Sequence, residues 1–345
     1  MTTPASAPPA SAPTASGRAS TAASSPVASL ASPRFLALAG TVVLWAAAFP
    51  AIRVGVDGLG VSALSFLRLA VAAVALAVAA PFAGVRLPRR RDLPLIALCG
   101  ATGMTAYQLL LNWGEVHVAA GTASLLIAVA PVFSVLLGAV PLAEPVTRTV
   151  VAGSAVALAG SAVVALSGGA GGFSSGALVV LAAALVQGVY HVASKPLLRH
   201  RGGLEVATYA MVAGTLFALP LAPAAVRGAA DAPAGALGAA VFLGLLPSAL
   251  GFVLWGHAVA RLSLSTSTAA LYLVPPVALA VSFVWLSEVP RPVALLGGVV
   301  SVLGVVLINR RTRPVAAPPS ATSGCRQTPA PRPRSIVMSE EPKES

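Results

Sequence analysis

Arg68 is the residue whose position most clearly demands a chemical explanation, because it is the single charge within a long apolar run. An unpaired charge inside a bilayer costs about 2.5–3.5 kcal/mol on insertion scales, so its guanidinium should face protein, water or a ligand. The guanidinium could have a functional role, or it could be structural, by snorkelling to the interface or by clamping a helix end through a bond to a backbone carbonyl. The sequence leaves both interpretations open.

Polar and aromatic side chains in the other apolar runs suit the lining of a small-molecule pocket. Gln108 and Asn112 are four residues apart and share a helix face, although Asn112 lies near a helix end, where packing is its expected role. Aromatic faces with a few polar groups are typical of such pockets, and hydrogen bonding between helices is the alternative. The predicted substrate-binding residues are Trp45, Arg68, Tyr107, Gln108, Gln187, Tyr190, His191, Trp255 and Tyr272.

The chemistry that an enzyme or an ATP-driven pump needs is missing from the sequence. There is no His-Glu-x-x-His zinc motif, and the aspartates Asp57, Asp92 and Asp231 fall in predicted loops. Cys99 has no histidine near it in sequence, and Cys325 lies in a polar tail, so neither a disulfide framework nor a metal site is indicated. No phosphate-binding loop occurs. We therefore expect no catalytic residue, no metal and no cofactor.

The composition shows that membrane-spanning helices must carry these residues. Only 9% of the 345 residues are charged and 57% are hydrophobic, with a mean hydropathy of +0.88, whereas soluble domains are roughly 25% charged. About 20 apolar residues of helix cross a hydrocarbon core roughly 30 Å thick, and nothing alternates as barrel strands would. The expected fold class is an all-α integral membrane protein. Its ten predicted transmembrane helices are about 35–53, 62–84, 93–113, 119–142, 147–166, 175–195, 206–225, 236–258, 264–287 and 292–309.

The sequence repeats itself with a shift of 144 residues. Pro131 and Glu144 in the fourth helix return as Pro275 and Glu288 in the ninth. The same shift aligns Gly100 with Gly244, Ser124 with Thr268, Gly153 with Gly297, and Gly160 with Gly304. Internal duplication of this kind is typical of secondary transporters. Because each copy holds five helices, the second must lie inverted, and two inverted halves can alternate between inward-open and outward-open packings.

The repeat also predicts how the chain is divided. The first five-helix copy covers 35–166, a linker covers 167–174 and the second five-helix copy covers 175–309. The tails 1–34 and 310–345 are rich in small and polar residues and have no hydrophobic face, so we expect them to be disordered.

The repeated prolines and glutamates are expected to shape the structure or to gate it. Pro131 and Pro275 each remove a backbone donor at an equivalent depth in the two halves. Glu144 and Glu288 end their helices close to water, where each can cap the helix that follows through its N-terminal dipole. Gating is the alternative role, because switch elements often lie at helix ends.

Small residues recur on one face of the fifth and tenth helices. Gly153 and Ala157 are four residues apart, as are Gly297 and Ser301 at the shifted positions. Such faces allow helices to approach closely. They predict either a scaffold between the two halves or the surface of a homodimer.

Basic residues predict the orientation in the membrane. With the N-terminus inside, nine Arg or Lys residues fall in cytoplasmic loops and three in outer loops or at their edges, which places both termini in the cytoplasm of a multi-pass protein of the plasma (inner) membrane. The net charge of +12 is spread over connections and tails, so a nucleic-acid partner is not indicated. Arg86, Arg89, Arg90 and Arg91 could also contact anionic membrane lipid.

These features resemble the drug/metabolite transporter superfamily, in its ten-helix EamA-type branch. The resemblance spans about 35–309 and implies an inner-membrane carrier of small metabolites, often an exporter of amino acids or related solutes, with a central cavity lined by both halves. It rests on Trp45-Ala-Ala-Ala-Phe49-Pro50, on Ser65-Phe-Leu-Arg68, on Thr122-Ala-Ser-Leu-Leu-Ile before Pro131 and Glu144, and on Thr266-Ser-Thr-Ala-Ala-Leu-Tyr272 before Pro275 and Glu288.

The predicted function is secondary transport of a small metabolite, amino acid-like or another small organic solute, by alternating access. Export coupled to protons is the expected mode. His191, His257 and Glu115 are the candidate coupling groups, because they are the titratable groups nearest to the membrane interior. A passive channel is the alternative, followed by a membrane-embedded enzyme. The sequence does not specify the substrate, because selectivity depends on cavity shape.

Overall fold

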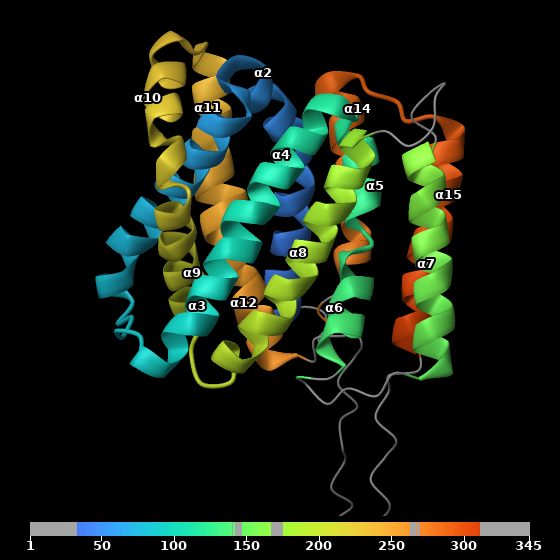
Figure 1. The fold of residues 1–345 in the computed structure, drawn as a ribbon, viewed down its shortest axis with the longest axis horizontal. Coiled ribbons are helices and arrows are strands. Elements are labelled where there is room, and N and C mark those ends of the chain that lie inside the picture. Colours follow the sequence, from blue (N-terminus) through green and yellow to red (C-terminus); the bar gives the residue numbers. More distant parts are fainter. Residues whose placement is uncertain are drawn as a thin grey trace, which may run out of the picture. The chain divides into compact units, whose positions relative to one another are not determined.

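In the structure, a computed structural model, all the secondary-structure elements of the described residues are helices (Figure 1). The described residues are 33–139, 141, 147–166, 175–262, 267 and 270–310. Glu144 and the 167–174 linker lie outside them. Within them the chain forms ten membrane-spanning segments, which confirms the predicted fold class.

The helices differ in detail from the ten predicted runs, because several are bent or broken. Breaks at Ala128, Val129 and Ala218 divide two of the predicted runs into α5 with α6 and α9 with α10. In chain order the elements are α2 (Pro33–Phe82), η1 (Arg90–Asp92), α3 (Leu93–Cys99), η2 (Gly100–Ala106), α4 (Tyr107–His117), α5 (Ala120–Ile127), α6 (Ala130–Gly138), α7 (Arg148–Leu166), α8 (Ser175–Leu198), α9 (Gly203–Phe217), η3 (Leu219–Leu221), α10 (Ala222–Asp231), α11 (Ala234–Leu243), η4 (Gly244–Leu250), α12 (Gly251–Arg261), η5 (Leu271–Leu273), α14 (Val274–Leu286) and α15 (Pro292–Arg310).

Helix α2 contains the first two membrane crossings. Its 50 residues rise about 75 Å at 1.5 Å per residue, more than twice the hydrocarbon thickness. Gly60 lies inside it with φ 75° and ψ 166°, a backbone conformation open to glycine and strained for other residues. The chain therefore reverses at Gly60, and the two arms of α2 cross the membrane in opposite directions.

The 144-residue repeat persists in the backbone of the third and eighth crossings. Both contain a seven-residue π-helical segment, η2 from Gly100 and η4 from Gly244, so the two start 144 residues apart. The α-helices that follow, α4 and α12, each have 11 residues and are displaced by the same shift. Because π-helical segments are rare, this match shows that the two halves share a local backbone as well as a sequence pattern.

Helices α7 and α15 pack through their small residues in a reciprocal way. A Cβ added to Gly160 would lie 2.6 Å from the carbonyl oxygen of Gly297, and one added to Gly304 would lie 2.7 Å from that of Gly153. The 144-residue shift converts the first of these contacts into the second, so the helices are antiparallel and related by a pseudo-twofold axis. The small-residue faces therefore join the two halves, which is the scaffold that the sequence predicted as one of two alternatives.

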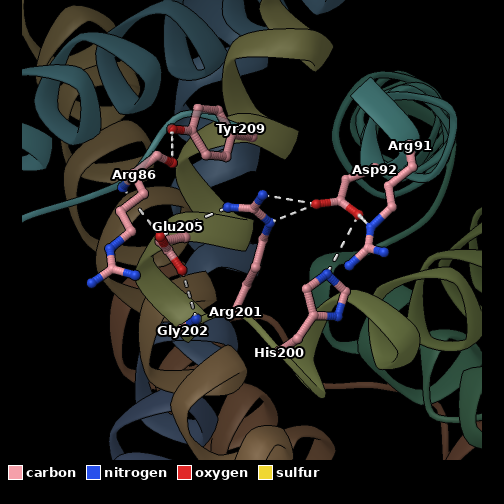
Figure 2. Close-up of polar contacts among 8 residues, drawn as sticks. All are labelled: Arg86, Arg91, Asp92, His200, Arg201, Gly202, Glu205 and Tyr209. Atoms are coloured by element: carbon pink, nitrogen blue, oxygen red, sulfur yellow. Dashed lines mark hydrogen bonds and ion pairs between the residues drawn. The ribbon is translucent and has the colours of Figure 1, made fainter. Parts of the chain in front are cut away.

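The bundle has two ends, the Asp92 end and the Gly60 end. The Asp92 end is where α8 ends and α3 and α9 begin, and the Gly60 end is where α2 reverses. At the Asp92 end an ion-pair cluster ties the two halves together (Figure 2). Arg201 donates from Nε and Nη2 to Asp92 Oδ2 at 2.9 and 2.8 Å, and His200 Nε2 lies 3.4 Å from Oδ1. Asp92 is only 4% exposed, and these contacts satisfy it.

A second carboxylate continues this cluster. Glu205 accepts the backbone N–H of Gly202 at 3.0 Å and that of Arg86 at 3.1 Å, so it caps α9 and holds the connection that precedes η1 (Figure 2). The hydroxyl of Tyr209 donates to the carbonyl oxygen of Arg86. The connection between α2 and α3 is therefore fixed to the start of α9.

Candidate functional site

A cavity lies at the centre of the described helices, where the two halves meet. Its volume, counted as the space open to the centres of water molecules, is about 50 Å³. Both arms of α2 contribute to it, as do α4, α5, α6, α8, η4, α12, η5 and α14. The residues that line it are Trp45, Ala48, Phe49, Ile52, Arg68, Tyr107, Leu111, Ser124, Ile127, Ala128, Ala130, Pro131, Gln187, His191, Pro247, Phe252, Leu271, Val274 and Pro275.

Arg68 supplies the positive charge of this cavity. It is 4% exposed, and its Nε and Nη2 donate to Ser248 Oγ at 3.3 and 3.2 Å. Its Nη1 donates to Asn112 Oδ1 at 3.4 Å, and Asn112 Nδ2 donates to Ser65 Oγ at 2.8 Å. These bonds are long and their acceptors are neutral, and no carboxylate among the described residues comes within 4.0 Å of the guanidinium. Arg68 therefore keeps a charge that an anionic ligand can neutralise.

The close packing of α2 against η4 explains how Ser248 reaches Arg68. A Cβ at Gly244 would lie 2.9 Å from the carbonyl oxygen of Arg68 and 2.6 Å from Val71, so only glycine permits this approach. Ser248 stands four residues further along η4, on the side that meets α2. The π-helical segment thus brings a hydroxyl to the guanidinium.

Glu115 lies near Arg68, although it does not line the cavity. Its side chain is completely buried, and neither carboxylate oxygen has a hydrogen-bond partner in the described structure. Arg68, Arg53 and Glu288 are close enough to act on it electrostatically, and Arg53 Nη1 donates to its backbone carbonyl. A buried carboxylate without donors is costly to keep charged, so Glu115 is unusual in this chain.

Aromatic rings form one wall of the cavity. Trp45 Nε1 donates to the carbonyl oxygen of Pro247 at 3.1 Å, and its ring centroid lies 5.2 Å from that of Phe252 and 5.5 Å from that of Trp255. A Cβ at Gly251 would lie 2.7 Å from Trp45 Nε1, so the first residue of α12 must be small to seat the indole. This wall is rigid, because its rings pack against each other.

Helix α8 supplies the remaining polar groups of the cavity. His191 is 1% exposed, and its Nδ1 lies 2.8 Å from Ser134 Oγ. Its Nε2 lies 3.4 Å from Gln187 Nε2, one helical turn earlier. Ser134 Oγ also donates to the carbonyl oxygen of Ala130 at 3.0 Å. These residues form a buried chain of hydrogen bonds that ends at the cavity.

Pro131 and Pro275 both line the cavity at the starts of equivalent helices. Each lies in the first turn of its helix, α6 or α14, where the missing N–H has no intrahelical partner to lose. Helix α6 begins at Ala130 and α14 at Val274, which is again the 144-residue shift. Each proline therefore marks the start of a helix whose first turn lies beside the cavity.

The structure brings together five of the nine predicted binding residues, namely Trp45, Arg68, Tyr107, Gln187 and His191. The other four, Gln108, Tyr190, Trp255 and Tyr272, are buried and do not line the cavity. Gln108 is completely buried on α4, and neither of its amide atoms has a partner among the described residues. The ring of Tyr190 packs against Phe252.

Two further predicted residues lie away from the cavity. His257 is half-buried on α12, one turn before Arg261, which donates to its carbonyl oxygen at 3.2 Å. Glu288 was expected to cap the helix after it, α15, but its Oε2 accepts the backbone N–H of Ala120 at 3.0 Å, at the start of α5 in the other half.

Sequence reasoning missed Phe252 and Ser248. Ser248 is a short polar residue beside Pro247, and its shifted counterpart is Met104, so the pairing of halves gave no reason to select it. A proline with a neighbouring hydroxyl inside a span is the signal that could have found it.

The site geometry defines a class of protein, a multi-pass membrane protein with two inverted halves around a central cavity. Comparisons with known proteins agree. The model of the EamA-like transporter family matches residues 33–166 and 174–310. The probable terminal-alkyne amino-acid exporter of Streptantibioticus cattleyicolor is 68% identical over 276 residues, which cover 80% of this chain and 93% of that protein.

A more distant relative and a solved structure extend the comparison. The uncharacterized transporter YdfC of Bacillus subtilis is 37% identical over 265 residues, covering 76% of this chain and 86% of the relative. A solved structure titled only "Crystal structure of protein" matches with a TM-score of 0.55 at 20% identity, over 81% of this chain and 98% of that one, and it shows the fold alone. The chain belongs to the EamA-like transporter family. It is a transporter and not an enzyme.

Proposed function

We propose that this transporter exports an α-amino acid and that the carboxylate of the substrate binds Arg68. The observation that carries the proposal is the buried guanidinium at the cavity, whose hydrogen-bond acceptors are all neutral. A carboxylate matches the planar donor fork of arginine. The name of the relative from Streptantibioticus cattleyicolor supports an amino acid as the substrate and export as the direction.

The size of the cavity supports alternating access. The space open to the centres of water molecules is only about 50 Å³, which leaves little freedom for an amino acid in this packing. Substrate entry then requires the halves to move apart. The matched η2 and η4 segments and the antiparallel α7 and α15 give the two halves equivalent packings between which they can exchange.

In the proposed orientation both termini and the Asp92 end face the cytoplasm. The bias of basic residues toward that side supports it. Substrate would enter from the Asp92 end and leave at the Gly60 end. The ion-pair cluster in Figure 2 would then close the entry side.

We further propose that export is coupled to protons through Glu115. Its carboxylate is buried without a donor, and Arg68, Arg53 and Glu288 act on it electrostatically, so substrate bound to Arg68 would change its charge balance. His191 is a weaker candidate, because both of its ring nitrogens have partners. His257 is also weaker, because it lies away from the cavity.

Counterflow in sealed proteoliposomes tests the site. Proteoliposomes that contain the wild-type protein and are loaded with an unlabelled terminal-alkyne amino acid should take up the labelled compound. The uptake should saturate and show trans-stimulation. Arg68→Gln should lower counterflow by at least about 30-fold at unchanged abundance of folded protein, because it removes a buried charge pair with the ligand. Arg68→Lys should retain part of the activity, because it keeps the charge and loses the fork.

Two outcomes would contradict the proposed site. If Arg68→Gln removes folded protein while the surviving molecules transport normally, Arg68 is a structural clamp. If the wild type shows linear flux without trans-stimulation, the protein is a passive channel.

An imposed pH gradient tests the coupling. Accumulation by the wild type should rise with the gradient, and Glu115→Gln should remove this response because it cannot exchange a proton. His257→Gln is the matched control and should keep the response. Wild-type counterflow that ignores the gradient, or a Glu115→Gln variant that still responds, would remove Glu115 from the mechanism.

A further inference from the structure

The hydrogen bonds around His191 fix the proton on its ring. The amide nitrogen of Gln187, 3.4 Å from His191 Nε2, can only donate, so Nε2 must accept. The neutral imidazole then carries its proton on Nδ1 and donates it to Ser134 Oγ at 2.8 Å. The Ser134 hydroxyl is left free to donate to the carbonyl oxygen of Ala130 at 3.0 Å. Each donor in the chain has one acceptor, so the chain has one direction.

This direction leaves one acceptor unused. Gln187 is 3% exposed and lines the cavity, and its Oε1 has no hydrogen-bond partner in the part of the chain that the structure describes. If the amide rotated, Oε1 would accept from the other tautomer of His191, the Ser134 hydroxyl would have to donate to Nδ1, and its bond to the Ala130 carbonyl oxygen would be lost. A buried acceptor without a donor is unfavourable, so a ligand that brings a donor to Oε1 gains affinity.

The aromatic wall places this acceptor away from Arg68. The ring centroid of His191 lies 5.1 Å from that of Trp255, which lies 5.5 Å from that of Trp45. Trp45 is bonded in turn to η4, the segment that also holds Arg68. A row of contacting rings therefore connects Trp45, on the Arg68 side, to His191 beside Gln187, and the two end rings of this row line the cavity. With its carboxylate on Arg68, an amino acid keeps its ammonium at that end and can extend only its side chain toward Gln187.

We propose that Gln187, held by His191, reads the end of the substrate side chain by accepting a hydrogen bond from the C–H of a terminal alkyne. This inference rests on the proposed function. Most of the side chains that line the cavity are apolar, so a hydroxyl or ammonium at the tip would lose several hydrogen bonds to water and regain few. A terminal alkyne is apolar along its length and carries one polarised C–H at its tip, which suits a single acceptor at the end of an apolar slot.

Competition between matched amino acids tests the proposal. Propargylglycine ends in a terminal alkyne, norvaline is its saturated analogue, and 2-amino-4-hexynoic acid carries the same alkyne capped by a methyl group. In proteoliposomes the wild type should prefer propargylglycine to norvaline by about 3-fold in kcat/KM, the size expected of a weak C–H donor. Gln187→Leu should bring this ratio close to one and should also remove discrimination against the capped alkyne.

His191 acts on selectivity only through Gln187. His191→Phe keeps an aromatic ring beside Trp255 and leaves the Gln187 amide free to rotate. It should therefore lower the preference for propargylglycine over norvaline, as Gln187→Leu does. Gln108→Leu is the matched control, because Gln108 is also a buried glutamine with unpartnered amide atoms and does not line the cavity. The preference of Gln108→Leu for propargylglycine over norvaline should equal that of the wild type.

The failure of this inference differs from the failure of the proposed function. If the wild type transports amino acids and Gln187→Leu keeps the full preference for the terminal alkyne, Gln187 does not read the side chain. If Gln108→Leu lowers the ratio as much as Gln187→Leu does, the effect is not specific to the cavity and the inference is overturned. A wild type that transports no amino acid overturns the proposed function itself.

Discussion

The third and eighth crossings have equivalent backbones, yet their side chains differ sharply. In the third crossing, η2 and α4 carry three polar residues that are completely buried. In the eighth, η4 and α12 have the same π-helical segment and the same helix length, but apolar residues stand at the three equivalent positions, and the completely buried polar side chain is Ser248. The 144-residue shift pairs Gln108 with Phe252, Asn112 with Gly256, and Glu115 with Val259.

This comparison distinguishes the packing contacts, which both halves require, from the polar groups of the site, which are required only once. Both halves must pack in two equivalent ways, so their helix breaks and glycine contacts are duplicated. Arg68 and its support at Asn112 occur in the first half alone, which fits the single carboxylate of the proposed substrate. The second half contributes Ser248 and the aromatic wall. The pseudo-twofold axis therefore relates the backbones of the two halves, but the side chains that form the site do not follow it.

The largest expected effect tests the duplicated packing. Gly160→Leu and Gly304→Leu should each destabilise the protein by about 3 kcal/mol, because each side chain would have to enter the backbone of the facing helix. The two losses should be similar, since the contacts are reciprocal. Thermal unfolding in detergent measures both.

A control for this pair is Gly238→Leu on α11, where a Cβ would meet nothing within 4 Å. Its stability should stay within about 0.5 kcal/mol of the wild type. If one of the two glycine variants were as stable as this control, the reciprocal contact would not be what joins the halves.

A smaller effect tests the difference in chemistry. Ser248→Ala should raise KM about 10-fold, because Arg68 would lose the hydroxyl that holds two of its nitrogens, and hydrogen bonds to charged groups contribute about 1.5–3 kcal/mol. Met104→Leu changes the counterpart in η2 and should leave KM unchanged. Equal KM values for Ser248→Ala and the wild type would show that Arg68 does not need this support.

The smallest effect concerns the two ends of the bundle. The shift pairs Asp92 with Ala236 and Arg201 with Asp57, so the ion pair of the Asp92 end has no counterpart at the Gly60 end. Asp92→Asn should lower the midpoint of thermal unfolding by a few degrees and make single cysteines introduced near the Asp92 end more reactive, because one contact between the halves is weakened.

The matched control for that experiment is Asp57→Asn at the Gly60 end. It should change neither the midpoint nor the reactivity at the Asp92 end. A uniform change in reactivity at both ends would mean that Asp92 supports general stability and does not hold that end closed.

The fold followed from the sequence to a large extent. Charge depletion and run length predicted ten helices, and the shift between Pro131 and Pro275 predicted the duplication, because a bilayer leaves the backbone few other ways to satisfy its hydrogen bonds. The sequence did not reveal the π-helical segments at Gly100 and Gly244 or the merging of two crossings across Gly60. These features depend on the packing between helices, which the periodicity of hydrophobic residues does not encode.

The site followed only in part. Arg68 was visible because a lone charge in an apolar run is conspicuous, and Gln187 and His191 were visible as polar residues one turn apart. Gln108 looked equally suitable, yet the rotation of α4 about its axis keeps it out of the cavity lining. Rotation of a helix is set by its neighbours, so a single chain cannot show which polar face meets the cavity.

The amino-acid sequence determined the class of protein, the number of crossings, the inverted repeat and the small-residue faces of α7 and α15, whereas their contact with each other came from the structure. Each of the features that the sequence determined follows from hydrophobic length, parity or spacing, all of which are local or periodic properties. The folded molecule determined that Ser248 holds Arg68 from 180 residues away and that Ser134 and His191, 57 residues apart, orient Gln187. Those contacts join residues from different helices, and their hydrogen bonds depend on distances that only the packed bundle fixes.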